Sequence, residues 1–147
     1  MRFVRSFILV VAVAALPAAA SAQKQPVVPA GMNATATLTP GIRDGNVLYV
    51  SGQLGVSRTD PDSSIQGQTK RALENVQRVV EAAGSSMSNV LKCTVFLADM
   101  KDFAGMNSAY TQAFPKEPPA RSTIAVAGLA SPTAKVEIEC IAAIPPK

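Results

Sequence analysis

The sequence predicts an α+β fold in which one mixed β-sheet carries two helices on one face. Segments of apolar alternation typical of strands are separated by two segments with helical spacing, in the order strand, helix, strand, helix, strand, strand. Of the 147 residues, 48% are hydrophobic, enough for the core of one domain. A single layer of helices leaves the other sheet face open, which favours oligomerisation.

The first 22 residues resemble a secretory signal peptide. Arg2 and Arg5 precede the apolar run 7–16, and Ala20-Ser21-Ala22 has the small-residue pattern of a cleavage site. The run is much shorter than the roughly 20 residues that span a bilayer. We therefore expect cleavage after Ala22, a periplasmic or secreted protein with no membrane association after removal of the signal, and a single mature domain at 23–147.

The charge of the chain gives no support for binding to nucleic acid. The formal net charge is +4, from 14 basic and 10 acidic side chains. Removing the two arginines of segment 1–22 leaves 12 against 10, or +2. Because electrostatic binding to nucleic acid needs clustered basic residues, we expect no nucleic-acid partner.

The first elements of the mature chain are an arm and a strand. Residues 23–40 contain several prolines and predict an extended arm with a short strand at 34–38. A turn then leads into a strand at 47–53. Gly52, directly after Ser51, leaves room for a ligand or a second backbone, although a plain strand end is the alternative.

The middle of the chain predicts helix, strand and helix. Helical spacing begins near Ile65 and ends at Gly84, a residue typical of helix C-termini. Residues 90–97 read as a strand, and residues 101–114 as a second helix. The second helix has one apolar stripe, expected to be core, formed by Phe103, Met106, Tyr110 and Ala113.

Two strands in the last third carry the best functional candidates. Along 121–126, Arg121 and Thr123 share one face, and along 135–144, Glu137 and Glu139 do. We expect all four side chains on the uncovered sheet face, on neighbouring strands, as a site for a small carboxylated molecule. For Arg121 the alternative is a salt bridge, and for the glutamates an ion-paired or solvated face.

Other kinds of site are limited by composition. The chain has no histidine, which excludes His-based triads and His-ligated metals, and we expect no metal. Cys93 and Cys140 are the only thiols, and their spacing does not fit a zinc site. They are either two small buried side chains or a disulfide, and the sequence leaves both open.

Four short motifs together resemble one known family. They are PARST at 119–123, VEIECIA at 136–142, VSGQ at 50–53, and TVFL at 94–97 followed by Asn107 and Tyr110. Each motif alone is weak, but their order and spacing over residues 41–144 are similar to those of the YjgF/RidA (L-PSP) family. The resemblance implies a chorismate mutase-like sandwich that assembles as a homotrimer, with clefts between subunits.

The resemblance also implies an activity, the hydrolysis of reactive enamines and imines such as 2-aminoacrylate to 2-keto acids and ammonia, without metal or organic cofactor. In this reading Arg121 binds the carboxylate of the imino or keto acid and Glu137 activates water. The other implied binding residues are Ser51, Gly52, Asn107, Tyr110 and Thr123.

Two departures from the family pattern bear on this expectation. Leu38 stands where the family commonly has a tyrosine, and Thr123 stands where it often has a cysteine. The alternative functions are a non-catalytic trimer that binds small carboxylates or acts as a chaperone, and an endoribonuclease. The weak net charge and the lack of an exposed basic-aromatic stripe count against the last.

Overall fold

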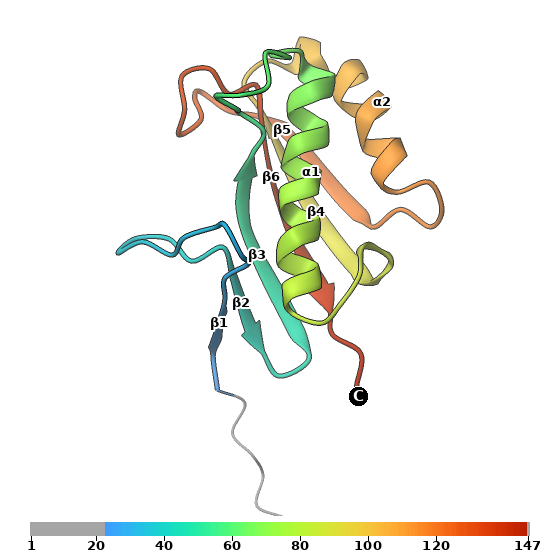
Figure 1. Ribbon diagram of the computed structural model, residues 1–147. Helices are drawn as coiled ribbons and strands as arrows, with labels where there is room; N and C mark the ends of the chain where they lie inside the picture. The colour runs from blue at the N-terminus through green and yellow to red at the C-terminus, as the bar shows by residue number, and fades with distance from the viewer. Residues whose placement is uncertain (1–22, 147) are drawn as a thin grey trace, which may run out of the picture.

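The computed structural model describes residues 23–146, and in them a six-stranded sheet lies beneath two helices (Figure 1). The strands are β1 (Gln25–Val27), β2 (Gly41–Asp44), β3 (Val47–Leu54), β4 (Val90–Leu97), β5 (Ala120–Ala125) and β6 (Val136–Ala143). The helices are α1 (Ile65–Ala82) and α2 (Phe103–Ala113), with short 3₁₀ helices η1 (Met87–Asn89) and η2 (Met100–Asp102).

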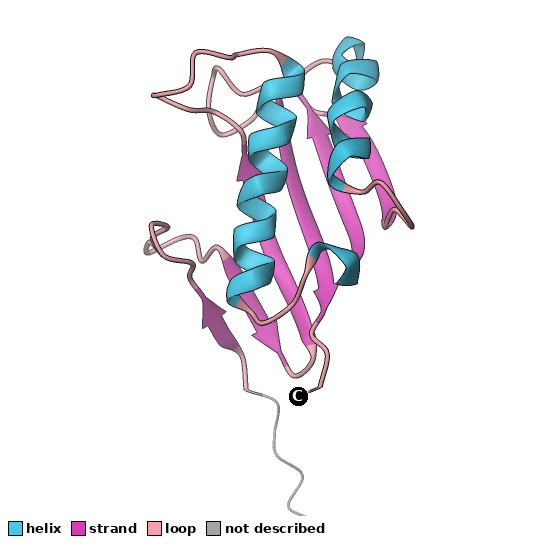
Figure 2. Cartoon of the chain, turned by 45° about the vertical axis from the view of Figure 1, so that its right-hand side comes forward, coloured by secondary structure: helices cyan, strands magenta, loops and turns pink. Residues whose placement is uncertain are grey.

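The sheet is mixed, as the sequence predicts. Its strand order is β1-β2-β3-β6-β4-β5, and only the β4–β5 pair is parallel. Parallel neighbours need a crossover connection, and α2 supplies it. Both helices cover the same sheet face (Figure 2), and no helix of the described residues lies on the opposite face. No helix between residues 23 and 146 is long and apolar enough to cross a membrane.

Helix α1 has the limits that its sequence predicts. The Ser64 hydroxyl accepts a hydrogen bond of 3.1 Å from the backbone N–H of Gly67, which caps the helix start. Gly84 has φ +80°, a conformation that favours glycine and stops a helix. The core between α1 and the sheet includes Leu48, Val50, Leu73, Val76, Val80, Val95, Leu97, Val136 and Ile138.

The expected short strand at 34–38 is wrong. The Thr35 hydroxyl accepts a hydrogen bond from the Leu38 N–H at 3.0 Å, and the Thr35 N–H donates to the Leu38 carbonyl at 2.8 Å. These local bonds form a turn instead of a strand, because a threonine side chain competes with ladder pairing. The arm contributes β1 instead, which pairs with β2.

A disulfide joins the neighbouring strands β4 and β6. Cys93 and Cys140 are direct register partners with a Cα–Cα distance of 4.1 Å, and their sulfurs are bonded. Both residues are buried, at 0% and 2% exposure, and lie beneath the helices. The bridge closes a loop of 47 residues in sequence, so it restricts the unfolded chain.

We expect loss of this bridge to lower the free energy of unfolding by about 4 kcal/mol, from the loop-closure entropy of the unfolded chain. Urea unfolding of the oxidised protein, compared with protein refolded in a dithiol reductant, measures the difference. The double variant Cys93→Ala/Cys140→Ala is the control and should not respond to reductant. Equal stability with and without reductant would contradict the prediction.

Candidate active site

Glu137 and Glu139 lie on the sheet face opposite α1 and α2. In the register of β6 with β4, Glu137 pairs with Phe96 and Glu139 with Thr94. The intervening Ile138 is fully buried beneath the helices, so the two glutamates point the other way. This agrees with the expectation for these two carboxylates, which are half-buried and exposed, respectively.

Gly52 provides the space that the Glu137 side chain occupies. The pairing of β3 with β6 shifts register between Val50 and Gln53, which marks a bulge at Ser51 and Gly52. A Cβ atom at Gly52 would overlap the Glu137 carboxylate and lie 2.8 Å from its Cδ atom. The Ser51 hydroxyl donates to the Thr39 carbonyl at 2.6 Å, which holds the bulge against the N-terminal arm. The predicted residues Ser51, Gly52 and Glu137 are therefore neighbours.

Arg121 lies on the other face, beneath α2. Its register partner on β4 is Cys93, which is buried against the helices. Its guanidinium carbon is 4.6 Å from the centroid of the Tyr110 ring and 5.9 Å from that of Phe103. Its Nη1 atom is 3.9 Å from the sulfur of Met106. The site around Arg121 is thus formed by one strand and the first turns of α2.

We expected Arg121 and Thr123 to lie on the same sheet face as Glu137 and Glu139, and on a neighbouring strand. Both expectations are wrong. Strand β4 lies between β5 and β6. Thr123 pairs with the buried Val95, so it faces the helices with Arg121. Alternation within a strand states which residues share a face but not which face that is. In β5 the apolar Ile124 takes the open face, where it is 46% exposed.

The predicted residues of α2 lie near Arg121. Tyr110 is 3% exposed and lies under the guanidinium. Asn107 is half-buried and, at helical spacing, lies on the α2 face that carries Phe103 and Tyr110. Phe103 was expected in the core, yet it is 39% exposed because it stands at the start of α2, where the helix passes the edge strand.

Burial raises the pKa of the Tyr110 phenol to about 12, although the positive charge of Arg121 opposes the rise. The phenol is therefore neutral throughout the physiological range. Within residues 23–146 neither its hydroxyl nor the buried hydroxyl of Thr123 has a hydrogen-bond partner.

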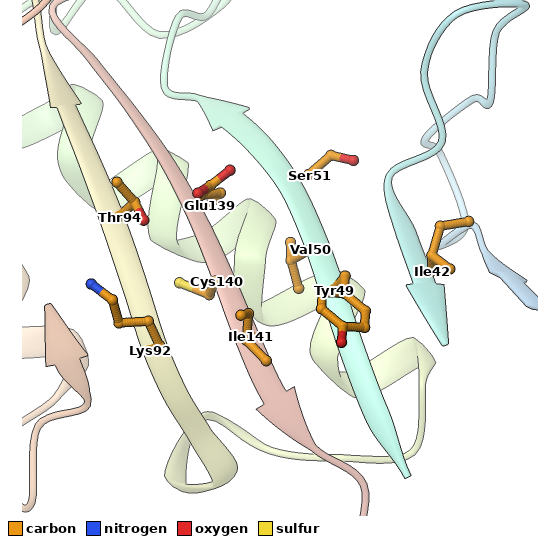
Figure 3. Close-up of a pocket in the computed structure, with 9 residues that line it drawn as sticks. All are labelled: Ile42, Tyr49, Val50, Ser51, Lys92, Thr94, Glu139, Cys140 and Ile141. Atoms are coloured by element: carbon orange, nitrogen blue, oxygen red, sulfur yellow. The ribbon is translucent and has the colours of Figure 1, made fainter. Parts of the chain in front are cut away.

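A pocket of about 280 Å³ opens on the uncovered face, with α1 behind the sheet (Figure 3). Lys92 was not predicted as a site residue, and its Nζ atom donates to the Ser122 hydroxyl at 2.7 Å. Neither Arg121 nor Glu137 lines this pocket, although Ser51 and Glu139 do. Strand alternation predicts that Lys92 shares a face with Thr94. It does not place Lys92 near Glu139, because that depends on the register between β4 and β6.

Comparison with known proteins agrees with the fold and the motifs. The profile of the family described as Endoribonuclease L-PSP matches residues 29–144. The chain belongs to the L-PSP family, also called the YjgF/RidA family. A relative in the family, Reactive Intermediate Deaminase A of Arabidopsis thaliana, described as chloroplastic, is 39% identical over 137 residues, or 89% of this chain and 72% of the relative.

Two further family members are similar over most of the chain. Protein mmf1 of Schizosaccharomyces pombe, described as mitochondrial, is 38% identical over 122 residues, or 81% of this chain and 75% of its own length. The crystal structure of Escherichia coli TdcF with bound serine is 35% identical, with a TM-score of 0.70, and the match covers 80% of this chain and 93% of that one.

The expectation of a periplasmic or secreted protein is contradicted by these relatives, which are described as mitochondrial and chloroplastic. Segment 1–22, on which that expectation depends, lies outside the described residues. Its two arginines and lack of acidic residues do not separate export from organelle targeting, because both kinds of N-terminal segment are basic and poor in acidic residues.

We expect Gly52→Ala to displace the Glu137 carboxylate at little cost in stability, less than about 1 kcal/mol, because that side chain is flexible and half-buried. Gly55→Ala is the matched control on the same segment. Its Cβ atom would meet the backbone carbonyl of Gln68, which cannot move aside, so a loss of about 3 kcal/mol is expected.

Urea unfolding of both variants measures the difference, and crystallography of Gly52→Ala shows the carboxylate. Equal destabilisation by the two substitutions would contradict this account of Gly52.

Proposed function

We propose that the protein hydrolyses 2-imino acids and their enamine tautomers to 2-keto acids and ammonia, at a site shared by two subunits of a homotrimer. The observation that carries the proposal is the separation of Arg121 and Glu137 on opposite faces of one sheet. A ligand that contacts both groups therefore needs the helix face at β5 of one chain and the open face of another.

Family relationships support the chemistry. The relative from Arabidopsis thaliana is named as a reactive intermediate deaminase, and the Escherichia coli relative was crystallised with serine, an amino acid with a free carboxylate. A site for an α-carboxylate fits Arg121, because a guanidinium presents paired N–H donors that match the two oxygens of a carboxylate.

In the proposed reaction Arg121 binds the substrate carboxylate and so fixes the position of the imine carbon. Glu137 of the adjacent chain accepts a proton from a water molecule as its oxygen bonds to that carbon. The proton then passes to nitrogen, which gives a carbinolamine. Transfer of the remaining hydroxyl proton to nitrogen forms the C=O bond as the C–N bond breaks, and ammonia leaves the 2-keto acid. Hydrolysis changes no oxidation state, so water and these two side chains balance the reaction.

The other predicted site residues lie beside either Glu137 or Arg121. Ser51 and Gly52 lie beside Glu137, and the absence of a side chain at Gly52 leaves its carboxylate in place. Two other predicted residues, Asn107 and Thr123, lie on the Arg121 side and would contact the carboxylate end of the ligand. Thr123 contributes a small hydroxyl there and no thiol.

Two single substitutions should separate substrate binding by Arg121 from catalysis by Glu137. Arg121→Ala should lower kcat/KM by about 100-fold or more, mostly through KM, because it removes carboxylate binding. Glu137→Gln should lower kcat by about 100-fold or more, because it removes the base. The assay is keto-acid release from imino acids generated in situ by an amino-acid oxidase.

Glu139→Gln is the matched control, since it removes a second carboxylate from the same strand and face. An equal loss in Glu139→Gln would contradict the assignment to Glu137. Binding of 2-keto acids without any acceleration of hydrolysis would favour the non-catalytic binding protein.

A site built from two chains should also be restored by mixing inactive variants. Arg121→Ala and Glu137→Ala subunits, unfolded together and reassembled in equal amounts, should regain up to about one quarter of wild-type activity, because about one interface in four then joins an intact Arg121 to an intact Glu137. Each variant reassembled alone is the control. No recovery from verified mixed oligomers would contradict a shared site.

A further inference from the structure

We infer that Tyr110 is a positioning residue that holds the Arg121 guanidinium against the face of its ring and leaves the N–H edge free for the substrate carboxylate. The inference rests on the proposed function, because it deepens the role of the same arginine. It assigns the effect to the aromatic ring of Tyr110 and not to the phenol hydroxyl.

The surroundings of Arg121 differ from those of three other arginines. Arg43, Arg71 and Arg78 donate to protein oxygens, at 2.7, 2.6 and 2.6 Å, respectively. Within residues 23–146 Arg121 forms no salt bridge, and its side chain makes one hydrogen-bond contact, at 3.9 Å to the Met106 sulfur, a weak acceptor. Its donors therefore remain available for an oxygen ligand.

The ring beneath the guanidinium is held rigidly. Tyr110 is 3% exposed, and its ring centroid lies 4.9 Å from that of Phe114 in a tilted arrangement. Arg121, by contrast, lies on the edge strand β5, where its long side chain has fewer neighbours to restrict it. A cation within about 6 Å of an aromatic centroid is attracted by the ring quadrupole. At 4.6 Å the Tyr110 ring is much closer than the Phe103 ring at 5.9 Å, so Tyr110 is the main platform.

The hydroxyl and the ring of Tyr110 have separable roles. Burial keeps the phenol neutral, with a pKa of about 12, so Arg121 meets a neutral ring and not a phenolate. The hydroxyl has no partner in the described part of the chain. A phenylalanine at this position keeps the platform, whereas a leucine keeps an apolar side chain but removes the quadrupole.

The test is the affinity of the assembled protein for 2-oxobutanoate, a stable 2-keto acid, measured by calorimetry. Tyr110→Phe should bind within about 2-fold of wild type, and Tyr110→Leu about 5- to 20-fold more weakly. Imine hydrolysis by Tyr110→Leu should show a raised KM with little change in kcat. Phe114→Leu is the matched control, because it removes a buried ring at the C-terminal end of α2 that contacts Tyr110 and not Arg121, and it should weaken binding clearly less than Tyr110→Leu does.

A second comparison separates positioning from general packing. In an Arg121→Gln background, which removes the cation that the ring attracts, Tyr110→Leu should weaken binding by less than about 2-fold. A similar weakening in both backgrounds, or in Phe114→Leu, would overturn the inference. The ligand-free protein supplies a further readout, since the ring-current shift of the Arg121 Nε–H signal in NMR should persist in Tyr110→Phe and vanish in Tyr110→Leu. Persistence in Tyr110→Leu would also overturn it.

The outcomes distinguish this inference from the proposed function. Unchanged 2-oxobutanoate affinity in Tyr110→Leu, together with imine hydrolysis by the wild type, would overturn the positioning role and leave the deaminase standing. The expected affinity pattern without any imine hydrolysis would support the positioning role and count against catalysis. Absence of 2-oxobutanoate binding by a folded, assembled wild type would overturn both.

Discussion

The pairing of β5 with β4, and of β4 with β6, is the constraint on which the candidate site depends. Cys93 lies at the centre of this register, with Arg121 beside it on one strand and Cys140 on the other. Because paired residues point to the same face, Arg121 faces the helices as Cys93 does. Glu137 occupies an odd position relative to Cys140 and so must face the opposite way. No rotation of either side chain crosses the sheet.

Because Arg121 and Glu137 lie on opposite sheet faces, the proposed reaction requires a second chain against the open face. Burial of exposed apolar side chains favours the same contact. Tyr49 and Ile124 are 50% and 46% exposed on that face, a large apolar exposure for strands at the middle and edge of a sheet. Burial of these side chains against another chain would remove them from water. In the proposed assembly the same contact brings Glu137 of one chain close to Arg121 of another, so association of the chains also forms the site.

The Arg121 guanidinium is surrounded by side chains that do not neutralise its charge, as the proposed binding of a carboxylate requires. A salt bridge within the chain would occupy the N–H donors that a ligand carboxylate requires. Aromatic and thioether neighbours, here Tyr110 and Met106, instead contact the guanidinium through weak interactions that leave those donors free. On the other face of the sheet, Gly52 leaves the space that the Glu137 carboxylate occupies, because glycine has no side chain.

The sequence alone determined the order and approximate limits of the main elements, because hydrophobic periodicity and the Gly84 stop are local properties. It also determined the family through short motifs, and the sharing of faces within each strand. Tertiary structure decided which face each strand presents, that β4 separates β5 from β6, and that Tyr110 lies under Arg121. These are long-range facts: alternation has no absolute direction until strands pair, and an edge strand can expose Ile124 while an arginine takes the covered side.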